Sequence, residues 1–191
     1  RSPHTTSSAA SDVYKRQAPK GLVGSKIRFS KISVGATENL IIAASLAKGV
    51  TILKNCAVEP EIKDLVKFLN KIGCNLKWIS KRSIKIRGVE SIKDTNYSVM
   101  FDRIEAGTYL IAAAITGGNL KIKNIDPNII NTEINILKKI GAKLIVKKNE
   151  ITIKELKKNR ETILKLLFAK KPDFLIFLIY YHCIAITSFT S

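Results

Sequence analysis

The feature that most constrains the fold of this chain is an internal repeat. The segment from Ala36 to Leu76 can be laid over the segment from Ala106 to Leu144, with one slip of a single residue. The matched pairs include Ala43-Ala44 with Ala112-Ala113, Gly49 with Gly118, Asn55 with Asn124, Ile72-Gly73 with Ile140-Gly141 and Leu76 with Leu144. Self-similarity over this length indicates one supersecondary unit that is used twice.

The first half of each copy predicts a helix followed by a strand. The expected elements are helices at about 38–47 and 106–116, ending near Gly49 and Gly118, and strands over 50–53 and 120–123. Between Leu40 and Leu46 the first helix has only Ser45 as a polar residue. We therefore expect it to be buried on nearly all sides, inside a ring of such units.

The second half of each copy predicts another helix and a β-hairpin. Pro60 and Pro127 each stand where proline opens a helix, and apolar residues then recur at helical spacing. The expected hairpins join 75–79 to 83–89 through Lys81-Arg82, and 143–147 to 150–156 through Lys148-Asn149. With a strand placed before each first helix, the unit reads βαβαββ. The fold class is α/β (α+β) with two units present.

The two ends of the chain differ from this repeat. Residues 1–17 have no apolar periodicity and resemble a cloning scar or a translated sequencing adapter, so we expect disorder there. Residues 156–191 lose the pattern and read as a truncated or frameshifted tail. The apolar run from Asp173 to Phe189 leaves a tail anchor as the alternative, although a membrane span needs roughly 20 apolar residues.

The net charge of +18 invites an anionic partner. Lysine far outnumbers arginine, however, and the lysines are scattered through every segment, as an AT-rich coding sequence would produce. No interleaving of arginine with aromatic residues marks a surface that reads bases. We therefore expect no nucleic-acid partner and no membrane partner.

Cysteine and histidine give no sign of a metal or cofactor. The three cysteines, Cys56, Cys74 and Cys183, have no metal-type spacing, and two of them stand among apolar residues. An odd number of cysteines without a disulfide framework is typical of the cytoplasm. The two histidines, His4 and His182, lie in the atypical ends. We expect no metal and no cofactor.

The junction before the first helix is the candidate binding site. A strand-like stretch runs through Lys31 and Ile32 to Ser33, and Val34 and Gly35 then lead into the helix. Bare backbone N–H groups at a helix start, beside the positive end of the helix dipole, favour a phosphate or diphosphate. The same pattern is also that of an ordinary helix cap.

Three motifs together carry a resemblance to a known family. They are SVGAT (Ser33–Thr37), EPEI followed by Asp64 (from Glu59), and DRIE followed by Gly107-Thr108 (from Asp102). With their surroundings they resemble the central part of the UDP-N-acetylglucosamine enolpyruvyl transferases (1-carboxyvinyltransferases), which open peptidoglycan synthesis. The resemblance covers roughly residues 22–153.

The resemblance implies a fold of two lobes. Each lobe in that family is an inside-out α/β barrel of three βαβαββ units. Residues 18–99 then correspond to the last unit of one lobe and residues 100–155 to the first unit of the other. The activity implied is transfer of the enolpyruvyl group of phosphoenolpyruvate to the 3′-hydroxyl of UDP-N-acetylglucosamine, with release of phosphate. The remaining partner is the rest of the two-lobed enzyme.

The resemblance also implies residue roles. Lys31, Ile32, Ser33 and Val34 match the family's loop for the UDP part of the substrate, with Gly35 beside them. Three further residues, Glu59, Asp102 and Arg103, match polar positions lining the cleft between the lobes. Each has a structural alternative, because Glu59 can cap the helix at Pro60 and Asp102–Arg103 can form a local ion pair.

No catalytic residue is assigned to this chain. The family's acid is a cysteine on a mobile loop, to which neither Cys56 nor Cys74 corresponds. Its phosphoenolpyruvate ligands and catalytic aspartate also fall outside the matched segment, so we expect no turnover by this chain alone. Val58 departs from the family, which usually has arginine there.

Three alternatives remain open at this point. A fragment of 3-phosphoshikimate enolpyruvyl transferase has the same architecture, although a lysine two residues before the serine of SVGAT favours the sugar-nucleotide enzyme. A basic nucleic-acid-binding module would account for the charge. A purely structural fragment would bind nothing, because half a cleft holds its ligand loosely.

Overall fold

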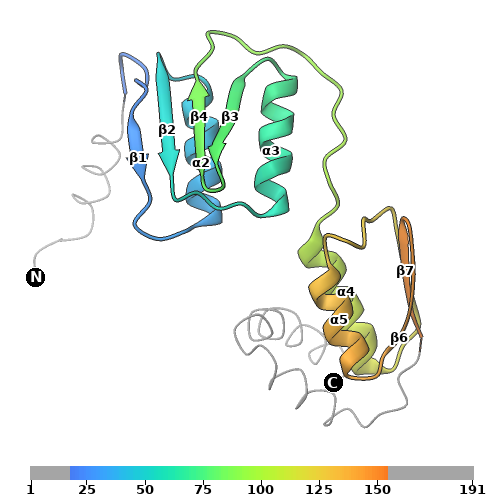
Figure 1. Ribbon diagram of the computed structural model, residues 1–191. Coiled ribbons are helices and arrows are strands. Elements are labelled where there is room, and N and C mark those ends of the chain that lie inside the picture. The colour runs from blue at the N-terminus through green and yellow to red at the C-terminus, as the bar shows by residue number, and fades with distance from the viewer. Residues whose placement is uncertain (1–17, 155–191) are drawn as a thin grey trace, which may run out of the picture. The chain divides into compact units, whose positions relative to one another are not determined.

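The computed structural model describes residues 18–154, and the chain divides between Met100 and Phe101 into two compact units (Figure 1). The end segments 1–17 and 155–191, with Cys183 and both histidines, lie outside the described residues. Each unit has its own hydrophobic core. The units are therefore considered one at a time.

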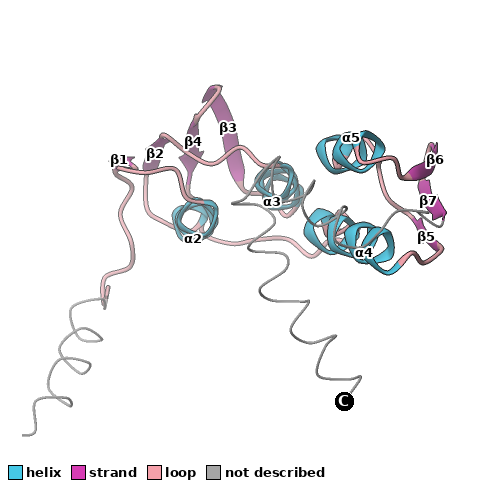
Figure 2. Ribbon diagram, turned by 90° about the horizontal axis from the view of Figure 1, so that it is seen from below, coloured by secondary structure: helices cyan, strands magenta, loops and turns pink. Residues whose placement is uncertain are grey.

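The first unit has all six expected elements in the order βαβαββ. They are β1 (Lys26–Arg28), α2 (Val34–Ser45), β2 (Val50–Lys54), α3 (Pro60–Lys71), β3 (Asn75–Ser80) and β4 (Ser83–Arg87). The strands form one sheet in the order β1-β2-β4-β3, in which β1 is parallel to β2 and the other neighbours are antiparallel. Figure 2 shows both helices on the same side of this sheet.

The second unit has five of these elements. They are α4 (Arg103–Thr116), β5 (Leu120–Lys123), α5 (Asn131–Lys139), β6 (Lys143–Lys147) and β7 (Glu150–Lys154). The antiparallel sheet has the order β5-β7-β6, and α4 and α5 again share one side of it (Figure 2). The described chain has no strand between β4 and α4. The second sheet therefore has no strand equivalent to β1, which pairs with β2 in the first sheet.

The segment before α4 is held against α3 instead of forming a strand. The Lys93 N–H donates to the carbonyl of Ile72 at 2.8 Å, at the end of α3. The Tyr97 hydroxyl donates to Asp64 Oδ1 at 2.7 Å, and the Met100 N–H donates to Asp64 Oδ2 at 3.3 Å. We call residues 88–100 the strap. Its first residues are held elsewhere, since the N–H groups of Gly88 and Val89 donate to the carbonyls of Gly49 at 3.1 Å and Ser45 at 2.9 Å. The strap is thus fixed within the first unit by bonds that are not those of a strand.

Backbone geometry confirms the repeat. Asn55 and Asn124 adopt left-handed conformations with φ of 62° and 59°, and they are the only non-glycine residues with positive φ in the described part of the chain. Each ends the strand after a first helix, where asparagine tolerates this conformation better than most residues. Gly73 and Gly141 match in the same way, with φ of 99° and 94°.

Three sequence expectations need correction. The glycine that ends α4 is Gly117, in the left-handed conformation with φ of 68°, and not Gly118. The helix expected after Pro127 begins only at Asn131. Pro127 instead starts a turn, in which the Ile130 N–H donates to the Pro127 carbonyl at 3.3 Å. Within this chain α2 is covered on one side only, since Ile42 and Leu46 are 51% and 58% exposed.

Candidate functional site

The start of α2 carries the predicted binding loop. Ser33 has extended backbone angles (φ −142°, ψ 126°) and is the N-cap residue, with its Oγ accepting from the Ala36 N–H at 3.3 Å. The N–H groups of Val34 and Gly35 precede the first intrahelical bond and have no hydrogen-bond partner among residues 18–154. A helix start with two open donors is suited to an anion.

The side chains of the loop leave that helix start open. Lys31, Ser33 and Gly35 are exposed, and Ile32 is half-exposed. A Cβ built on Gly35 would meet nothing within 4 Å, so there is room above the helix start. The first turn of α2 contains no acidic residue. Lys31 therefore adds positive charge to a helix end that no carboxylate of its own first turn neutralises.

Thr37 fixes this loop in place, and sequence reasoning did not identify it. Its side chain is fully buried, and Oγ1 donates to the Ser33 carbonyl at 2.7 Å and accepts from the Ala57 N–H at 3.0 Å. The bond to Ala57 ties the chain after β2 to the start of α2. The only sequence signal was a hydroxyl residue one turn after the N-cap serine.

Glu59 lies on the segment that Thr37 holds. It occupies the N-cap position of α3 with Pro60 following it, but its side chain makes no capping bond. Oε2 accepts instead from the Val58 N–H at 2.7 Å. The proposed capping role of this carboxylate is therefore wrong, and the side chain holds the local backbone turn.

Asp102 and Arg103 belong to the second unit. Asp102 is the N-cap residue of α4, where its Oδ1 accepts from the N–H groups of Ile104 at 2.8 Å and Glu105 at 3.0 Å. Arg103 is the first helical residue. Asp102 is therefore a helix cap, a role that sequence reasoning did not consider. It accepts from the second and third N–H groups of α4, whereas Ser33 accepts only from the third N–H group of α2.

A hollow of about 390 Å³ lies beside Asp102 within the second unit. It is formed between the N-terminal half of α4 and strand β5. Its polar lining residues are Asp102, Glu105, Tyr109, Lys121 and Lys123. Carboxylates on one wall and lysines on the other make this surface mixed in charge.

The two described cysteines are not placed for acid–base chemistry. Cys56 is fully buried and Cys74 is 6% exposed, and both are free thiols. Burial raises the pKa of the Cys56 thiol above its ordinary value, against smaller opposing contributions from backbone hydrogen bonds. Residues 18–154 also contain no group of three or more His, Cys, Asp or Glu side chains that could hold a metal ion.

No helix in the described part of the chain is both long enough and apolar enough to cross a bilayer. The helices here have 9 to 14 residues. Spanning the hydrocarbon core takes about 20 residues of α-helix.

Solved structures of other proteins share this fold. An enolpyruvyl transferase of Streptomyces tendae (NikO) superposes with a TM-score of 0.57 at 24% identity, over 65% of this chain and 30% of that protein. EPSP synthase of Acinetobacter baumannii gives a TM-score of 0.51 at 22% identity, over 70% of this chain and 32% of that protein. At these identities the likeness defines the fold, which is that of the enolpyruvyl transferases.

Sequence comparison then gives the family. The profile of the EPSP synthase (3-phosphoshikimate 1-carboxyvinyltransferase) family matches residues 8–185, and the chain belongs to this family. A relative named UDP-N-acetylglucosamine 1-carboxyvinyltransferase, from Pelagibacter ubique, is 66% identical over 78% of this chain. Relatives of the same name from Caldanaerobacter subterraneus and Vesicomyosocius okutanii are 42% and 44% identical, each over 81% of the chain. The chain spans only 36% or 37% of the length of these three relatives.

Proposed function

We propose that this chain is the central part of a UDP-N-acetylglucosamine 1-carboxyvinyltransferase. In this reaction the 3′-hydroxyl group of the sugar loses its proton and its oxygen adds to C2 of phosphoenolpyruvate, while C3 gains a proton. Loss of a proton from C3 and of phosphate from C2 of the tetrahedral intermediate then restores the double bond. This reaction is the first committed step of peptidoglycan synthesis. We place it in the cytoplasm, a location that the free thiols of the buried Cys56 and Cys74 support.

The observation that carries the proposal is the open start of α2. The N–H groups of Val34 and Gly35 have no hydrogen-bond partner among residues 18–154, and the exposed Lys31 precedes them by three and four residues. A diphosphate at this position would accept from these donors and lie at the positive end of the helix dipole. We assign Lys31, Ile32, Ser33, Val34 and Gly35 to binding of the UDP part of the substrate.

Glu59, Asp102 and Arg103 remain candidates for the lining of the substrate cleft. Glu59 is held on the segment that Thr37 ties to the binding loop, which supports a position near the substrate. Asp102 already serves as a cap, and that role does not require a substrate. We propose no catalytic acid in residues 18–154, since Cys56 and Cys74 are both buried, and we expect no turnover by this chain alone.

Binding by the isolated chain tests the proposal. Backbone amide NMR during titration with UDP-N-acetylglucosamine should shift the signals of residues 31–36. UDP alone should shift the same signals, because the diphosphate makes the contacts to the helix start. Shikimate 3-phosphate should leave them unchanged. Shifts with shikimate 3-phosphate and none with the sugar nucleotide would reassign the chain to the 3-phosphoshikimate enzyme.

Two variants distinguish UDP binding at residues 31–35 from non-specific UDP binding through the net positive charge of the chain. Lys31→Gln removes the cation beside the helix start and should weaken UDP binding about 5- to 10-fold, the range of one charge-assisted contact. Lys138→Gln on α5 removes the same charge from the other unit and should leave binding unchanged. Equal weakening by both variants would mean that UDP binds through net charge alone.

A further inference from the structure

The outer surface of the first sheet gathers positive charge that is scattered in the sequence. Strands β1, β2, β3 and β4 contain no aspartate or glutamate. Their exposed cations alternate with buried apolar residues and so share the face away from the helices. We call this the basic face: Lys26, Arg28, Lys54, Lys77, Lys85 and Arg87. No described element covers that side of the sheet (Figure 2).

Strand register places several of these cations next to one another. Lys77 lies directly opposite Lys85, and Arg28 directly opposite Lys54. Like charges in opposite positions of neighbouring strands destabilise a sheet. None of the six cations of the basic face has an ion-pair or hydrogen-bond partner through its side chain within residues 18–154. Charge of this kind, kept on one face without counter-ions, is complementary to an external polyanion.

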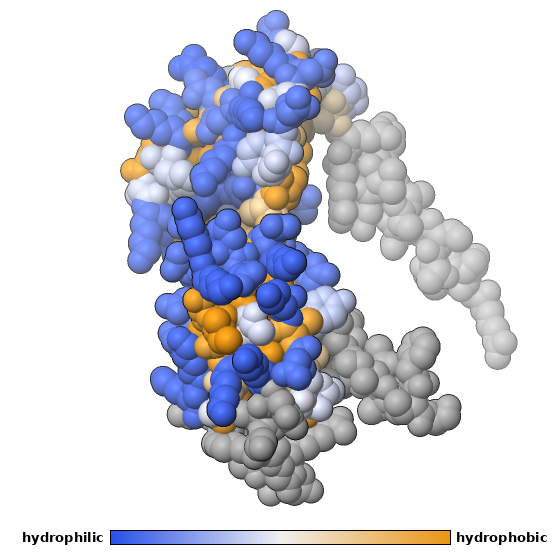
Figure 3. Space-filling view, turned by 90° about the vertical axis from the view of Figure 1, so that its right-hand side faces the viewer, coloured by the Kyte–Doolittle hydropathy of each residue, from blue (hydrophilic) through white to orange (hydrophobic). Residues whose placement is uncertain are grey.

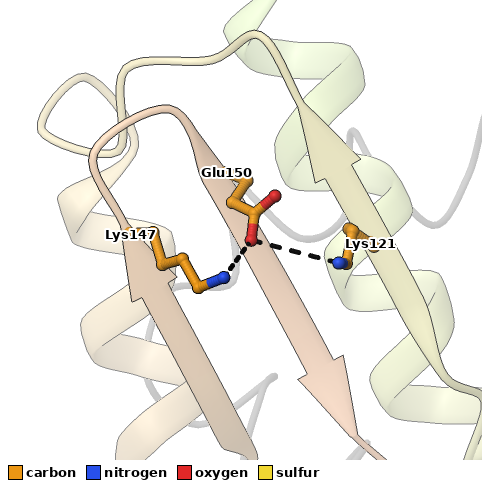
Figure 4. A network of polar contacts seen from close by, with 3 residues as sticks. All are labelled: Lys121, Lys147 and Glu150. Carbon is orange, nitrogen blue, oxygen red and sulfur yellow. Dashed lines mark ion pairs between the residues drawn. The ribbon is translucent and has the colours of Figure 1, made fainter.

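The second sheet differs from the first in having one internal counter-ion. Its strands carry Glu150, whose Oε1 lies 2.8 Å from Lys147 Nζ and 4.0 Å from Lys121 Nζ (Figure 4). In the described part of the first unit the acidic residues lie on the helices, on their caps or on the strap, at Glu38, Glu59, Glu61, Asp64, Glu90 and Asp94. The outer side of the second sheet is also rich in lysine, at Lys121, Lys123, Lys143, Lys147 and Lys154, but it includes the counter-ion Glu150. The basic face of the first sheet differs in having no carboxylate in any of its strands.

The chemistry of the basic face favours a bilayer over a nucleic acid. The six cations are distributed over four strands in two dimensions, as anionic lipid headgroups are. The strands contain a single aromatic residue, Trp78, which pairs with the buried Ile84 and so lies on the helix side. The basic face itself therefore contains no aromatic ring for base stacking, which single-stranded nucleic-acid sites commonly use. Half-buried Ile52 lies between Lys26 and Lys85 in the register and adds an aliphatic contact.

We propose that the basic face is a peripheral docking surface for an anionic lipid bilayer. Attachment is electrostatic, at the headgroup level, and no part of the sheet enters the hydrocarbon. Each lysine or arginine close to an anionic membrane surface strengthens binding about fivefold, and the effect falls off within a Debye length of roughly 8 Å at physiological salt. Such docking would hold the enzyme at the membrane without involving the start of α2.

Vesicle co-sedimentation of the full chain tests this surface. Vesicles of phosphatidylcholine with 30% phosphatidylglycerol, on the order used to mimic an anionic leaflet, should bind the chain at low salt and release it as salt rises. The triple variant Lys26→Gln, Lys77→Gln and Lys85→Gln should bind on the order of 100-fold more weakly. Removing like-charged neighbours relieves repulsion, so these substitutions should leave the fold intact, as circular dichroism will verify.

A matched control lowers the net charge by the same amount as the first triple variant. The triple variant Lys63→Gln, Lys67→Gln and Lys139→Gln removes three exposed lysines from helices α3 and α5. Both triple variants retain the same end segments, so any contribution of those segments is equal. We expect the control to bind vesicles within about twofold of the unchanged chain, since its lysines lie off the basic face.

Several results would overturn the proposal. Equal weakening in the two triple variants would mean that binding follows net charge rather than the basic face. Binding that persists on pure phosphatidylcholine would not be electrostatic. Preference for a duplex or single-stranded oligonucleotide over the anionic vesicles at matched salt would assign the basic face to nucleic acid. If the triple variant loses its fold, Lys85→Gln alone should still weaken vesicle binding about fivefold.

Discussion

The two units build the same helix start in opposite ways. In the first unit a neutral serine, Ser33, caps α2 and accepts one N–H, at 3.3 Å. In the second unit a carboxylate, Asp102, occupies the equivalent position before α4 and accepts two, at 2.8 and 3.0 Å. Glu105 adds a further negative charge in the first turn of α4, where α2 has none. The second unit thus has carboxylates of its own at the start of α4, whereas the first unit leaves the start of α2 open to an external anion.

The same contrast extends to the sheets. Glu150 lies among the lysines of the second sheet, whereas the first has no acidic residue in its strands. Figure 3 shows how hydrophilic residues cover much of the surface on one side of each unit, with smaller apolar patches between them. A duplicated fold can therefore assign different ligand roles to its copies through a few charged positions, while the cores remain alike.

The largest expected effect comes from emptying equivalent positions in the two cores. Ile84 in β4 and Ile151 in β7 are both fully buried. Ile84 lies opposite β2, the strand after α2, and Ile151 lies opposite β5, the strand after α4. Ile84→Ala and Ile151→Ala should each lower the free energy of unfolding of its own unit by about 2–5 kcal/mol, through lost burial and the cavity left behind. Hydrogen exchange followed by mass spectrometry reports each unit separately.

Because each unit has its own hydrophobic core, each substitution should change amide exchange only in the unit that contains it. Ile84→Ala should increase amide exchange in α2 and the first sheet and leave α4, α5 and the second sheet unchanged. Ile151→Ala should do the reverse. Increased exchange across both units with either variant would show that the two units unfold as one cooperative body.

Removing the two caps gives the next largest effect and compares the helix starts directly. Asp102→Ala leaves two helix donors unpaired and removes a favourable charge, so it should cost about 1–2 kcal/mol of stability. Ser33→Ala removes one longer hydrogen bond and should cost about 0.5 kcal/mol. Thermal unfolding curves measure both costs.

Ligand binding should rank the two caps in the opposite order. Ser33→Ala should weaken UDP binding, and Asp102→Ala should leave it unaffected. If Asp102→Ala weakens UDP binding as strongly as Ser33→Ala, the assignment of the diphosphate to α2 alone is wrong. A charge-retaining control, Asp102→Glu, checks whether any change follows from the carboxylate or from its geometry.

The strap is a feature of the first unit with no equivalent among the described residues of the second. Asp64 binds it through both carboxylate oxygens, and the ring of Tyr97 lies 5.3 Å from that of Phe68. Tyr97→Phe removes one hydrogen bond and keeps the ring, so it should destabilise the strap by about 1 kcal/mol. Faster amide exchange over residues 93–100 will show this, while exchange in the second sheet stays constant.

The strap also has a predicted pH dependence. The hydrogen bond to Asp64, with smaller contributions from burial and the charge of Asp64, raises the pKa of the Tyr97 hydroxyl above its usual value. Its contribution is therefore complete below the unfolded pKa of about 10 and is lost as pH rises through the higher folded pKa. Tyr97→Phe should abolish this alkaline increase in strap exchange. An unchanged alkaline increase in the variant would assign it to other groups.

Sequence reasoning predicted the parts of the fold that follow from periodicity. The repeat, the hairpin turns and the starts of β3, β4, β6 and β7 agree with the structure, because alternation and turn residues are local signals. Strand β4 ends two residues earlier than expected, at Arg87, and the last two residues expected for β7 lie outside the described residues. The missing strand before α4 was not predictable in this way. Residues 88–100 carry no proline to exclude a strand, and their conformation depends on Asp64, far away in the sequence.

The candidate site was likewise predictable only where it depends on local sequence. Ser33 as a helix cap follows from the local sequence, and its place at the start of α2 agrees with the structure. Its binding role stays a prediction. Thr37 was missed because its second bond, to Ala57, exists only after the first unit has folded. The basic face was missed for a similar reason, since scattered lysines become neighbours only through strand register.

The smallest expected effect concerns the ion pair that distinguishes the second sheet. The hydrogen bond from Lys147 lowers the pKa of Glu150 and Glu150 raises the pKa of Lys147 (Figure 4). The Lys147 side chain is exposed and that of Glu150 is partly exposed, so water screens the pair. The contribution of Glu150 should be present above its unfolded pKa of about 4.3 and lost as pH falls through the lower folded pKa. Salt should screen it, so Glu150→Gln should change thermal stability little at pH 7 and not at all at high salt. A loss of thermal stability as large as that of Asp102→Ala would show that the second sheet depends on its internal counter-ion. The first sheet has no such counter-ion, so it would then need an external anion to reach comparable stability.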